Sequence, residues 1–199
     1  MCETASRNAV NGGENITDAL AGDRILILDG AMGTMLQGMG LGEADFRSGV
    51  LADCPNELKG DNECLNLTRP DVVRRIHDGY IAAGADIIET NTFGANSIVQ
   101  GEYGCAGFAY DMAFEGARIA REAADCAMGR GLGRTVYVAG SVGPTSKSLT
   151  MSPDMDDPAR RSVTFDEMAE AYAAQIRGLI MGGVDLLLIE TCFDALNVK

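Results

Sequence analysis

Four short apolar runs in this chain each end in a cluster of polar residues. They occupy residues 25–28, 87–88, 136–139 and 186–189. Continuous apolar runs of this kind are typical of strands that are buried on both faces of a parallel sheet. In such proteins the ligand site lies at the carboxyl ends of the strands. The pattern therefore predicts a β/α protein whose working residues lie at one edge of the sheet.

The strands are expected to start near residues 25, 86, 135 and 185, so the units are about 50 residues long. A closed (β/α)8 barrel has eight such units, and 199 residues hold about four. No glycine-rich G-x-G-x-x-G turn follows the first run, which disfavours a doubly wound nucleotide fold. The sequence thus predicts an α/β chain with about the first four β/α units of a TIM barrel.

Signals for helix ends separate the expected strands. Pro70 suits the first turn of a helix, and Gly84 suits the position after its end. A second helix is expected over about 108–128. Thr164 and Glu167 form a capping box that starts a third helix.

Irregular loops are expected over residues 40–68, 93–107 and 141–162, because these stretches are polar or rich in Gly and Pro and show no clear period. Long loops in compact domains are often functional.

The composition narrows the possible partners. The chain is 46% hydrophobic and carries a formal net charge of −13, which argues against nucleic acid or an anionic membrane as a partner. No apolar run is long enough for a transmembrane helix. Residues 1–22 lack a secretory signal pattern. They are expected to be a flexible lead-in to one domain over 23–199, in a cytoplasmic protein.

Cysteine and histidine usage excludes several site types. The six cysteines include no Cys-x-x-Cys pair, so reduced thiols are expected. His77 is the only histidine and falls in the middle of a predicted helix. It is expected to be a surface or helix-packing residue. With this one histidine the sequence predicts no Ser-His-Asp triad and no two-histidine metal site.

Acidic residues follow three of the apolar runs. Asp29, next to Gly30, could hold a substrate ammonium group beside free backbone N–H groups, or could simply cap the turn. Glu89 and Glu190 end two other runs. Alternation of side chains allows only one residue of each Glu-Thr pair to face the interior. Glu89 could equally form a structural ion pair with a helix Arg, whereas Glu190 is the better site candidate. Ser141 could donate to a substrate carboxylate.

Five ordered motifs resemble the N-terminal homocysteine-binding domain of cobalamin-dependent methionine synthases, within the homocysteine S-methyltransferase family. They are ILDGAMGTMLQ, DNECLNLTRP, GADIIETNTFGAN, VAGSVGPT and DLLLIETCFD, which begin at residues 27, 61, 84, 138 and 185. Together they extend over nearly everything after residue 22. The resemblance implies a (β/α)8 barrel and transfer of a methyl group from methylcobalamin, derived from 5-methyltetrahydrofolate, to homocysteine.

The resemblance also implies roles for individual residues. Asp29 and Glu190 would bind the amino group of homocysteine. The Gly30 and Ala31 backbone, Ser141 and the Thr90–Thr92 region would surround its amino-acid end. In the family, zinc held by three cysteines activates the homocysteine thiol. The expected substrate-binding set is thus Asp29, Gly30, Ala31, Thr90, Thr92, Ser141 and Glu190.

The sequence departs from the family at the zinc site. The family holds its last two zinc ligands as an adjacent Cys-Cys pair, which this chain lacks, and Cys192 does not match a ligand position. No metal ligand and no catalytic residue are therefore expected here. Zinc, cobalamin and folate binding would belong to the missing half-barrel and further modules, and the chain alone is expected to be inactive.

Two alternatives stay open. The chain could be a non-catalytic half-barrel that associates with a partner or with itself, because a half-barrel exposes strand edges. It could also belong to a zinc thiol-methyltransferase with another methyl donor, such as betaine or S-methylmethionine.

Overall fold

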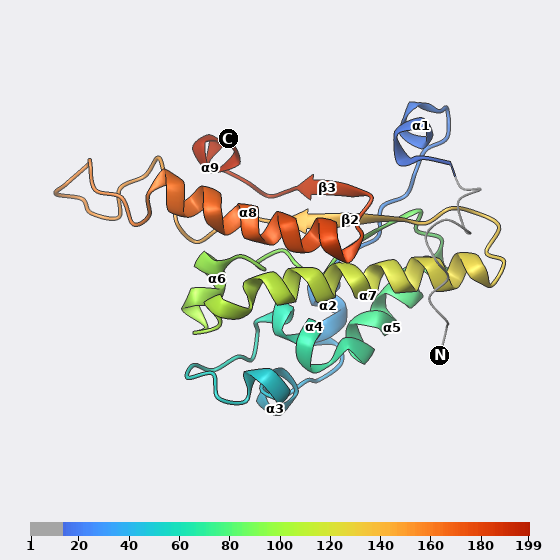
Figure 1. Cartoon of the computed structure of the whole chain (residues 1–199), viewed down its shortest axis with the longest axis horizontal. Helices are drawn as coiled ribbons and strands as arrows, with labels where there is room; N and C mark the ends of the chain where they lie inside the picture. The colour runs from blue at the N-terminus through green and yellow to red at the C-terminus, as the bar shows by residue number, and fades with distance from the viewer. Residues whose placement is uncertain (1–13) are drawn as a thin grey trace.

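A three-stranded parallel sheet forms the centre of the computed structural model, which describes residues 14–199 (Figure 1). The strands are β1 (Ile87–Glu89), β2 (Tyr137–Val142) and β3 (Leu186–Ile189), in the order β1-β2-β3. Ile88 pairs with Val138, and Gly140 pairs with Leu187. The parallel α/β architecture expected from the apolar runs is confirmed.

The first predicted strand, over residues 24–29, is only partly formed. Leu28 makes an isolated parallel bridge to Ile87, and the Asp29 N–H donates to the Ile87 carbonyl at 2.9 Å. Ile25 is 86% exposed and Ile27 is 58% exposed, so burial on both faces was a wrong expectation. Among the described residues no strand lies on the other side of this segment. The backbone N–H and C=O groups on its outer edge therefore have no strand to pair with.

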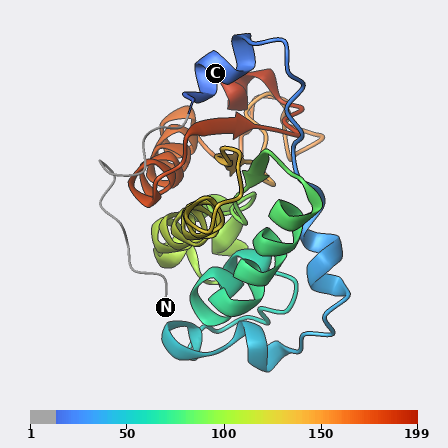
Figure 2. The same ribbon diagram turned by 90° about the vertical axis from the view of Figure 1, so that its right-hand side faces the viewer.

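Three long helices cover one face of the sheet (Figure 2). They are α5 (Pro70–Ala83), α7 (Ala109–Gly129) and α8 (Phe165–Gly182). Side chains that point to this face, such as Ile88 and Val138, pack against alanines of α7. The opposite face carries Ile87, Tyr137 and Ala139, as the alternation of a strand requires.

The predicted helix ends are confirmed. Pro70 begins α5, and Gly84 ends it with a φ of 113°, a left-handed conformation that glycine adopts without strain. Thr164 and Glu167 form the capping box at the start of α8. These ends depend on neighbouring residues in the chain, which is why the sequence alone predicts them.

Short helices replace two of the expected irregular loops, contrary to the sequence prediction. The first group is held by contacts between residues 15 or 16 positions apart, because the Glu43 carboxylate accepts from the N–H groups of Leu58 and Lys59. In the second group the Asn96 side chain caps a helix locally by accepting from the Val99 N–H at 3.0 Å. The elements are α3 (Glu43–Phe46), η1 (Gly49–Leu51), η2 (Asn62–Cys64), α4 (Leu65–Thr68), α6 (Ser97–Glu102) and η3 (Ala106–Phe108).

Three further short helices lie near the chain ends and the first turn. They are α1 (Ile16–Ala21), α2 (Met32–Gln37) and α9 (Ala195–Val198). Helix α1 falls in the expected lead-in, whose residues 1–13 lie outside the described part. Its Ala19 packs with Ile87 and Tyr137 on the face of the sheet opposite the long helices. No helix within residues 14–199 has the length and apolar character of a membrane span.

His77 is completely buried on α5, so it packs inside the protein and does not lie on the surface. Neither ring nitrogen has a hydrogen-bond partner among the described residues. Burial, with the charge of Arg74 nearby, lowers the pKa of His77 to about 4. The ring is therefore neutral at pH 7 and lies away from the strand ends.

Candidate functional site

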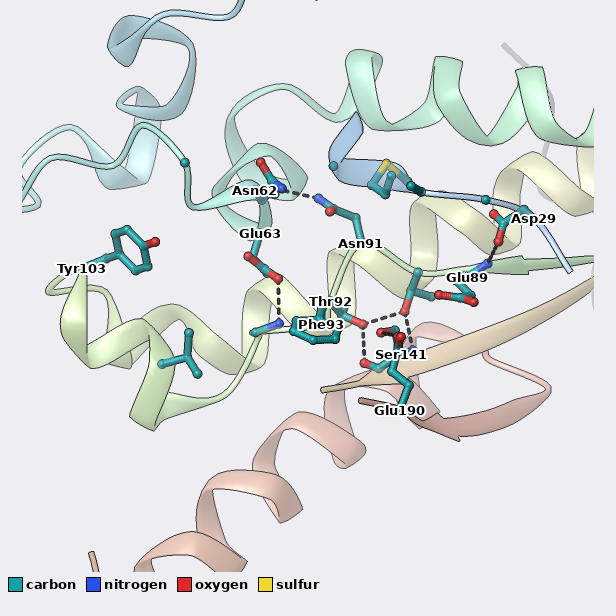
Figure 3. Close-up of a pocket in the computed structure, with 18 residues that line it drawn as sticks. Asp29, Asn62, Glu63, Glu89, Asn91, Thr92, Phe93, Tyr103, Ser141 and Glu190 are labelled. Carbon is teal, nitrogen blue, oxygen red and sulfur yellow. Dashed lines mark hydrogen bonds between the residues drawn. The ribbon is translucent and has the colours of Figure 1, made fainter. Parts of the chain in front are cut away.

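A cavity of about 560 Å³ opens at the carboxyl ends of the strands (Figure 3). Residues from the segment after residue 28, from the ends of β1 and β2, and from the position just after β3 line it. All seven residues of the expected substrate-binding set lie in its wall: Asp29, Gly30, Ala31, Thr90, Thr92, Ser141 and Glu190. The structure thus brings together residues that are up to 161 positions apart in the sequence (190 − 29). Their role in binding a ligand stays a prediction.

Three carboxyl groups lie at one end of the cavity. Asp29 accepts from the Glu89 N–H at 3.1 Å, and Glu89 and Glu190 line the cavity beside it. Burial, with the charge of the neighbouring carboxylates, raises the pKa of Asp29 to about 7. Burial and the Glu190 carboxyl raise the pKa of Glu89 to about 7 as well. This end of the cavity therefore favours a cationic ligand group that lets the carboxyls ionise.

Glu89 is the residue that the sequence left undecided, and the structure places it in the cavity. It makes no salt bridge with the Arg or Lys residues of the described chain. The signal that could have found it is its equivalence to Glu190, since both end a strand as the first residue of a Glu-Thr pair.

Thr90, Thr92 and Ser141 join the ends of β1 and β2. The Thr92 hydroxyl donates to the Ser141 carbonyl at 2.8 Å, and the Thr90 hydroxyl accepts from the Ser141 N–H at 3.0 Å. The two threonine hydroxyls lie 2.6 Å apart, so Thr90 donates to Thr92. Both hydroxyl protons are thus used within the protein, and these threonines position Ser141, whose own hydroxyl donates to Glu190.

The turn after Asp29 presents backbone groups to the cavity. Gly30 and Ala31 lead directly into α2. The N–H groups of these two residues have no backbone or side-chain acceptor among the described residues, although the Tyr80 hydroxyl donates to the Ala31 carbonyl at 3.3 Å. Two unpaired N–H groups beside a carboxylate suit the carboxylate and the ammonium group of one amino acid.

The other end of the cavity contains residues that the sequence did not single out. Figure 3 shows Glu63, Asn62 and Tyr103 there. The Glu63 carboxyl accepts from the Gly94 N–H at 2.7 Å. Its burial and the charge of Asp61 raise the pKa of Glu63 to about 8. The sequence motif over 61–70 pointed to this region, but only the fold places Glu63 in the cavity wall.

These raised pKa values predict that the chain is less stable at higher pH. A carboxyl whose pKa rises on folding stabilises the folded state below its unfolded pKa, and that stability is lost as pH passes the folded pKa. For Asp29, Glu63 and Glu89 the loss extends from about pH 4, near their unfolded pKa values, to about pH 7–8, near their folded values. His77, whose pKa falls from 6.5 to about 4 on folding, opposes the loss below about pH 6.5 and not above it. The free energy of unfolding, measured with urea, should therefore decrease between about pH 6.5 and pH 8.

Glu63→Gln isolates one part of that effect. The amide oxygen can still accept from the Gly94 N–H, and no proton is gained or lost. The variant should therefore show a shallower dependence of stability on pH than the native chain. Glu170→Gln, at an exposed position, should leave the slope unchanged. An equal slope in all three proteins would contradict the assignment of Glu63 as a buried acid.

The family's zinc does not fit the residues described. No group of three His, Cys, Asp or Glu side chains within residues 14–199 is arranged to hold a metal ion. Cys192 lies outside the cavity, in a groove between α8 and β3. Cys54, Cys64 and Cys105 are buried beneath the short helices.

Comparison with known proteins defines the class. The family model for homocysteine S-methyltransferase matches residues 26–199. The chain belongs to the homocysteine S-methyltransferase family.

Solved structures of the homocysteine methyltransferase MmuM from Escherichia coli share the fold. The metallated form has a TM-score of 0.68 at 21% identity, covering 92% of this chain and 60% of the MmuM chain. The oxidized form has a TM-score of 0.68 at 22% identity, covering 93% and 59%. This chain thus spans about 60% of the length of those relatives.

Proposed function

We propose that this chain is the homocysteine-binding part of a methionine synthase and holds the amino-acid end of homocysteine. The observation that carries the proposal is the meeting of Asp29 and Glu190 with the free Gly30 and Ala31 N–H groups in one cavity. A carboxylate pair suits the ammonium group, and the N–H groups suit the carboxylate. Family membership supports homocysteine as the amino acid and methyl transfer as the reaction.

The proposed contacts also orient the ligand. With both charged groups held at the strand ends, the thiol of homocysteine extends toward the open part of the cavity. In the complete reaction zinc would activate that thiol and methylcobalamin would supply the methyl group. We assign both to residues beyond those described, in a partner polypeptide or a longer protein. The sequence motifs, and not the cavity, support the cobalamin-dependent branch of the family.

Isothermal titration calorimetry tests the proposal. The 199-residue chain should bind L-homocysteine with one-to-one stoichiometry. It should bind 4-mercaptobutanoate, which lacks the amino group, at least about tenfold more weakly, since a charge-assisted hydrogen bond is worth about 1.5–3 kcal/mol. Zinc should not change the affinity, because residues 14–199 include no group of three His, Cys, Asp or Glu side chains that could hold it. Equal affinity for the two thiols, or zinc bound stoichiometrically through thiolates, would contradict the proposal.

A second function, self-association, is favoured by an apolar groove between α8 and β3. The groove is lined by Phe165, Tyr172 and Ile176 of α8 and by Leu187 and Ile189 of β3. Leu187 is 39% exposed and Ile189 is 56% exposed, against the expectation of a strand buried on both faces. No described strand pairs with the free edge of β3. Edges and apolar faces of this kind pair readily with other chains.

We infer that a second copy of the chain covers this groove when no other partner does. Sedimentation equilibrium should then show a dimer, and Ile189→Glu should shift it to monomer without a loss of helical circular dichroism. Met155→Glu, at a fully exposed loop position, is the control and should leave the dimer unchanged. A native chain that stays monomeric would rule out this function.

A further inference from the structure

We propose that Cys54 and Cys105 form a redox-active thiol pair, which a peroxide closes to a disulfide and a dithiol reductant reopens. The Sγ atoms of the two residues lie 3.1 Å apart, although 51 positions separate them in the sequence. A disulfide bond is about 2.05 Å long, so the sulfurs need to approach each other by only about 1 Å. Neither the proposed amino-acid site nor the groove between α8 and β3 uses these thiols.

The fold already holds the two segments that carry these cysteines against each other. Directly after the first cysteine, the Asn56 side chain donates to the Glu102 carbonyl at 2.9 Å. Directly before the second, Gly104 packs so closely on Pro55 that an added Cβ would lie 2.9 Å from the proline ring. These contacts join the same two segments as the sulfur pair does, so closing the bond requires little backbone movement.

Burial decides which thiol reacts first. Cys105 is completely buried, whereas Cys54 is 7% exposed, so a peroxide meets Cys54 first. The Cys54 thiolate attacks one peroxide oxygen, which breaks the O–O bond, forms a sulfenic acid and releases hydroxide. The Cys105 thiolate then attacks the Cys54 sulfur, forms the S–S bond and releases a second hydroxide. Each hydroxide takes up the proton of one thiol, so the two thiols and one hydrogen peroxide give one disulfide and two waters.

The closing step should be slow. Burial and the neighbouring Cys54 thiol raise the pKa of Cys105 to about 12, and the charge of Asp61 adds to the effect. The thiolate that completes the bond is therefore scarce at neutral pH. We expect closure to take on the order of minutes to hours.

Cys64 is the competing thiol, since it is buried in the same apolar cluster as Cys54 and Cys105. Its Sγ donates to an Asp61 carboxylate oxygen at 2.8 Å. Burial and the charge of that carboxylate raise the pKa of Cys64 well above its usual range. A thiol that stays protonated is a poor nucleophile, so Cys54 is the expected partner of Cys105.

The disulfide would join the two segments that form the far end of the cavity. Tyr103 lies shortly before Cys105, and Gly60 and Asn62 follow Cys54 along the chain; all three line the cavity. The carboxyls at the strand ends lie at the opposite end (Figure 3). Closing a loop of 51 positions restricts the unfolded chain, so the oxidised protein should melt about 5–15 °C higher than the reduced one.

Peptide mapping after treatment with hydrogen peroxide tests the assignment. Trypsin leaves each of the three clustered cysteines in a separate peptide, 48–59 for Cys54, 60–74 for Cys64 and 76–118 for Cys105. After the remaining thiols are alkylated, a non-reduced digest of the native chain and of Cys192→Ser should contain 48–59 linked to 76–118. Dithiothreitol should separate the two peptides. Cys54→Ser should show neither this link nor the rise in melting temperature.

The native chain alone decides the outcome, even if Cys54→Ser does not fold. No linked peptide, or a link between 60–74 and 76–118 in place of the expected one, overturns the inference. Oxidation of the chain in urea is the control for the fold, and it should give a mixture of links. The same mixture from the folded chain would also overturn the inference, because the fold would then not select the pair.

Discussion

Glu190→Gln should weaken L-homocysteine binding roughly 30- to 150-fold, a loss of about 2–3 kcal/mol. Glutamine keeps the size of the side chain and can still accept from the Ser141 hydroxyl. It removes one of the two negative charges expected to face the ammonium group. Calorimetry of the variant against the native chain measures the effect.

The control must show that the fold survives. Glu170→Gln, at an exposed position that pairs only with Arg177, should bind homocysteine as the native chain does. The urea unfolding midpoint of Glu190→Gln should stay near that of the native chain. An unchanged affinity would remove Glu190 from the amino-group site.

Gly182→Ala should lower the free energy of unfolding by about 1–3 kcal/mol, because it forces apart the two longest helices. A Cβ added at Gly182 would lie 2.5 Å from both the Ala117 Cβ and the Phe114 carbonyl oxygen of α7. Helices α7 and α8 lie side by side across the face of the sheet (Figure 1). Backbone and Cβ atoms cannot turn away as a flexible side chain could.

Gly79→Ala is the matched control, since the same methyl group is added to α5 where nothing lies within 4 Å. It should stabilise the chain by up to about 1 kcal/mol through helix propensity. Urea denaturation of the two variants should thus shift the midpoint in opposite directions. A shift in the same direction would show that α7 and α8 do not pack through Gly182.

The features that the sequence predicts well are local ones. Pro70, Gly84 and the Thr164–Glu167 capping box each act within one turn of a helix, so their effect is fixed by adjacent residues. The polar clusters after the apolar runs predict the edge of the sheet at which the cavity lies. The family motifs extend this to seven named residues, all of which line the cavity.

The features that the sequence does not predict depend on distant neighbours. An apolar run indicates a strand but not whether another strand covers it, and residues 24–29 and β3 are exposed for that reason. Whether Glu89 forms an ion pair or lines the cavity depends on which side chains the fold places beside it, and these are Asp29 and Glu190. Glu63 accepts a hydrogen bond from the N–H of Gly94, which is 31 positions away in the sequence. The short helices over 43–68 likewise depend on Glu43 reaching Leu58 and Lys59.

Backbone amide shift mapping tests the central proposal most directly. In ¹⁵N-labelled chain, L-homocysteine should perturb the amides of Gly30, Ala31 and Ser141 strongly, and those of the α8–β3 groove little. The perturbations at Gly30 and Ala31 should persist with 4-mercaptobutanoate at higher concentration, because the carboxylate contacts them. Perturbations confined to the α8–β3 groove, or none at saturating homocysteine, would contradict an amino-acid site at the strand ends.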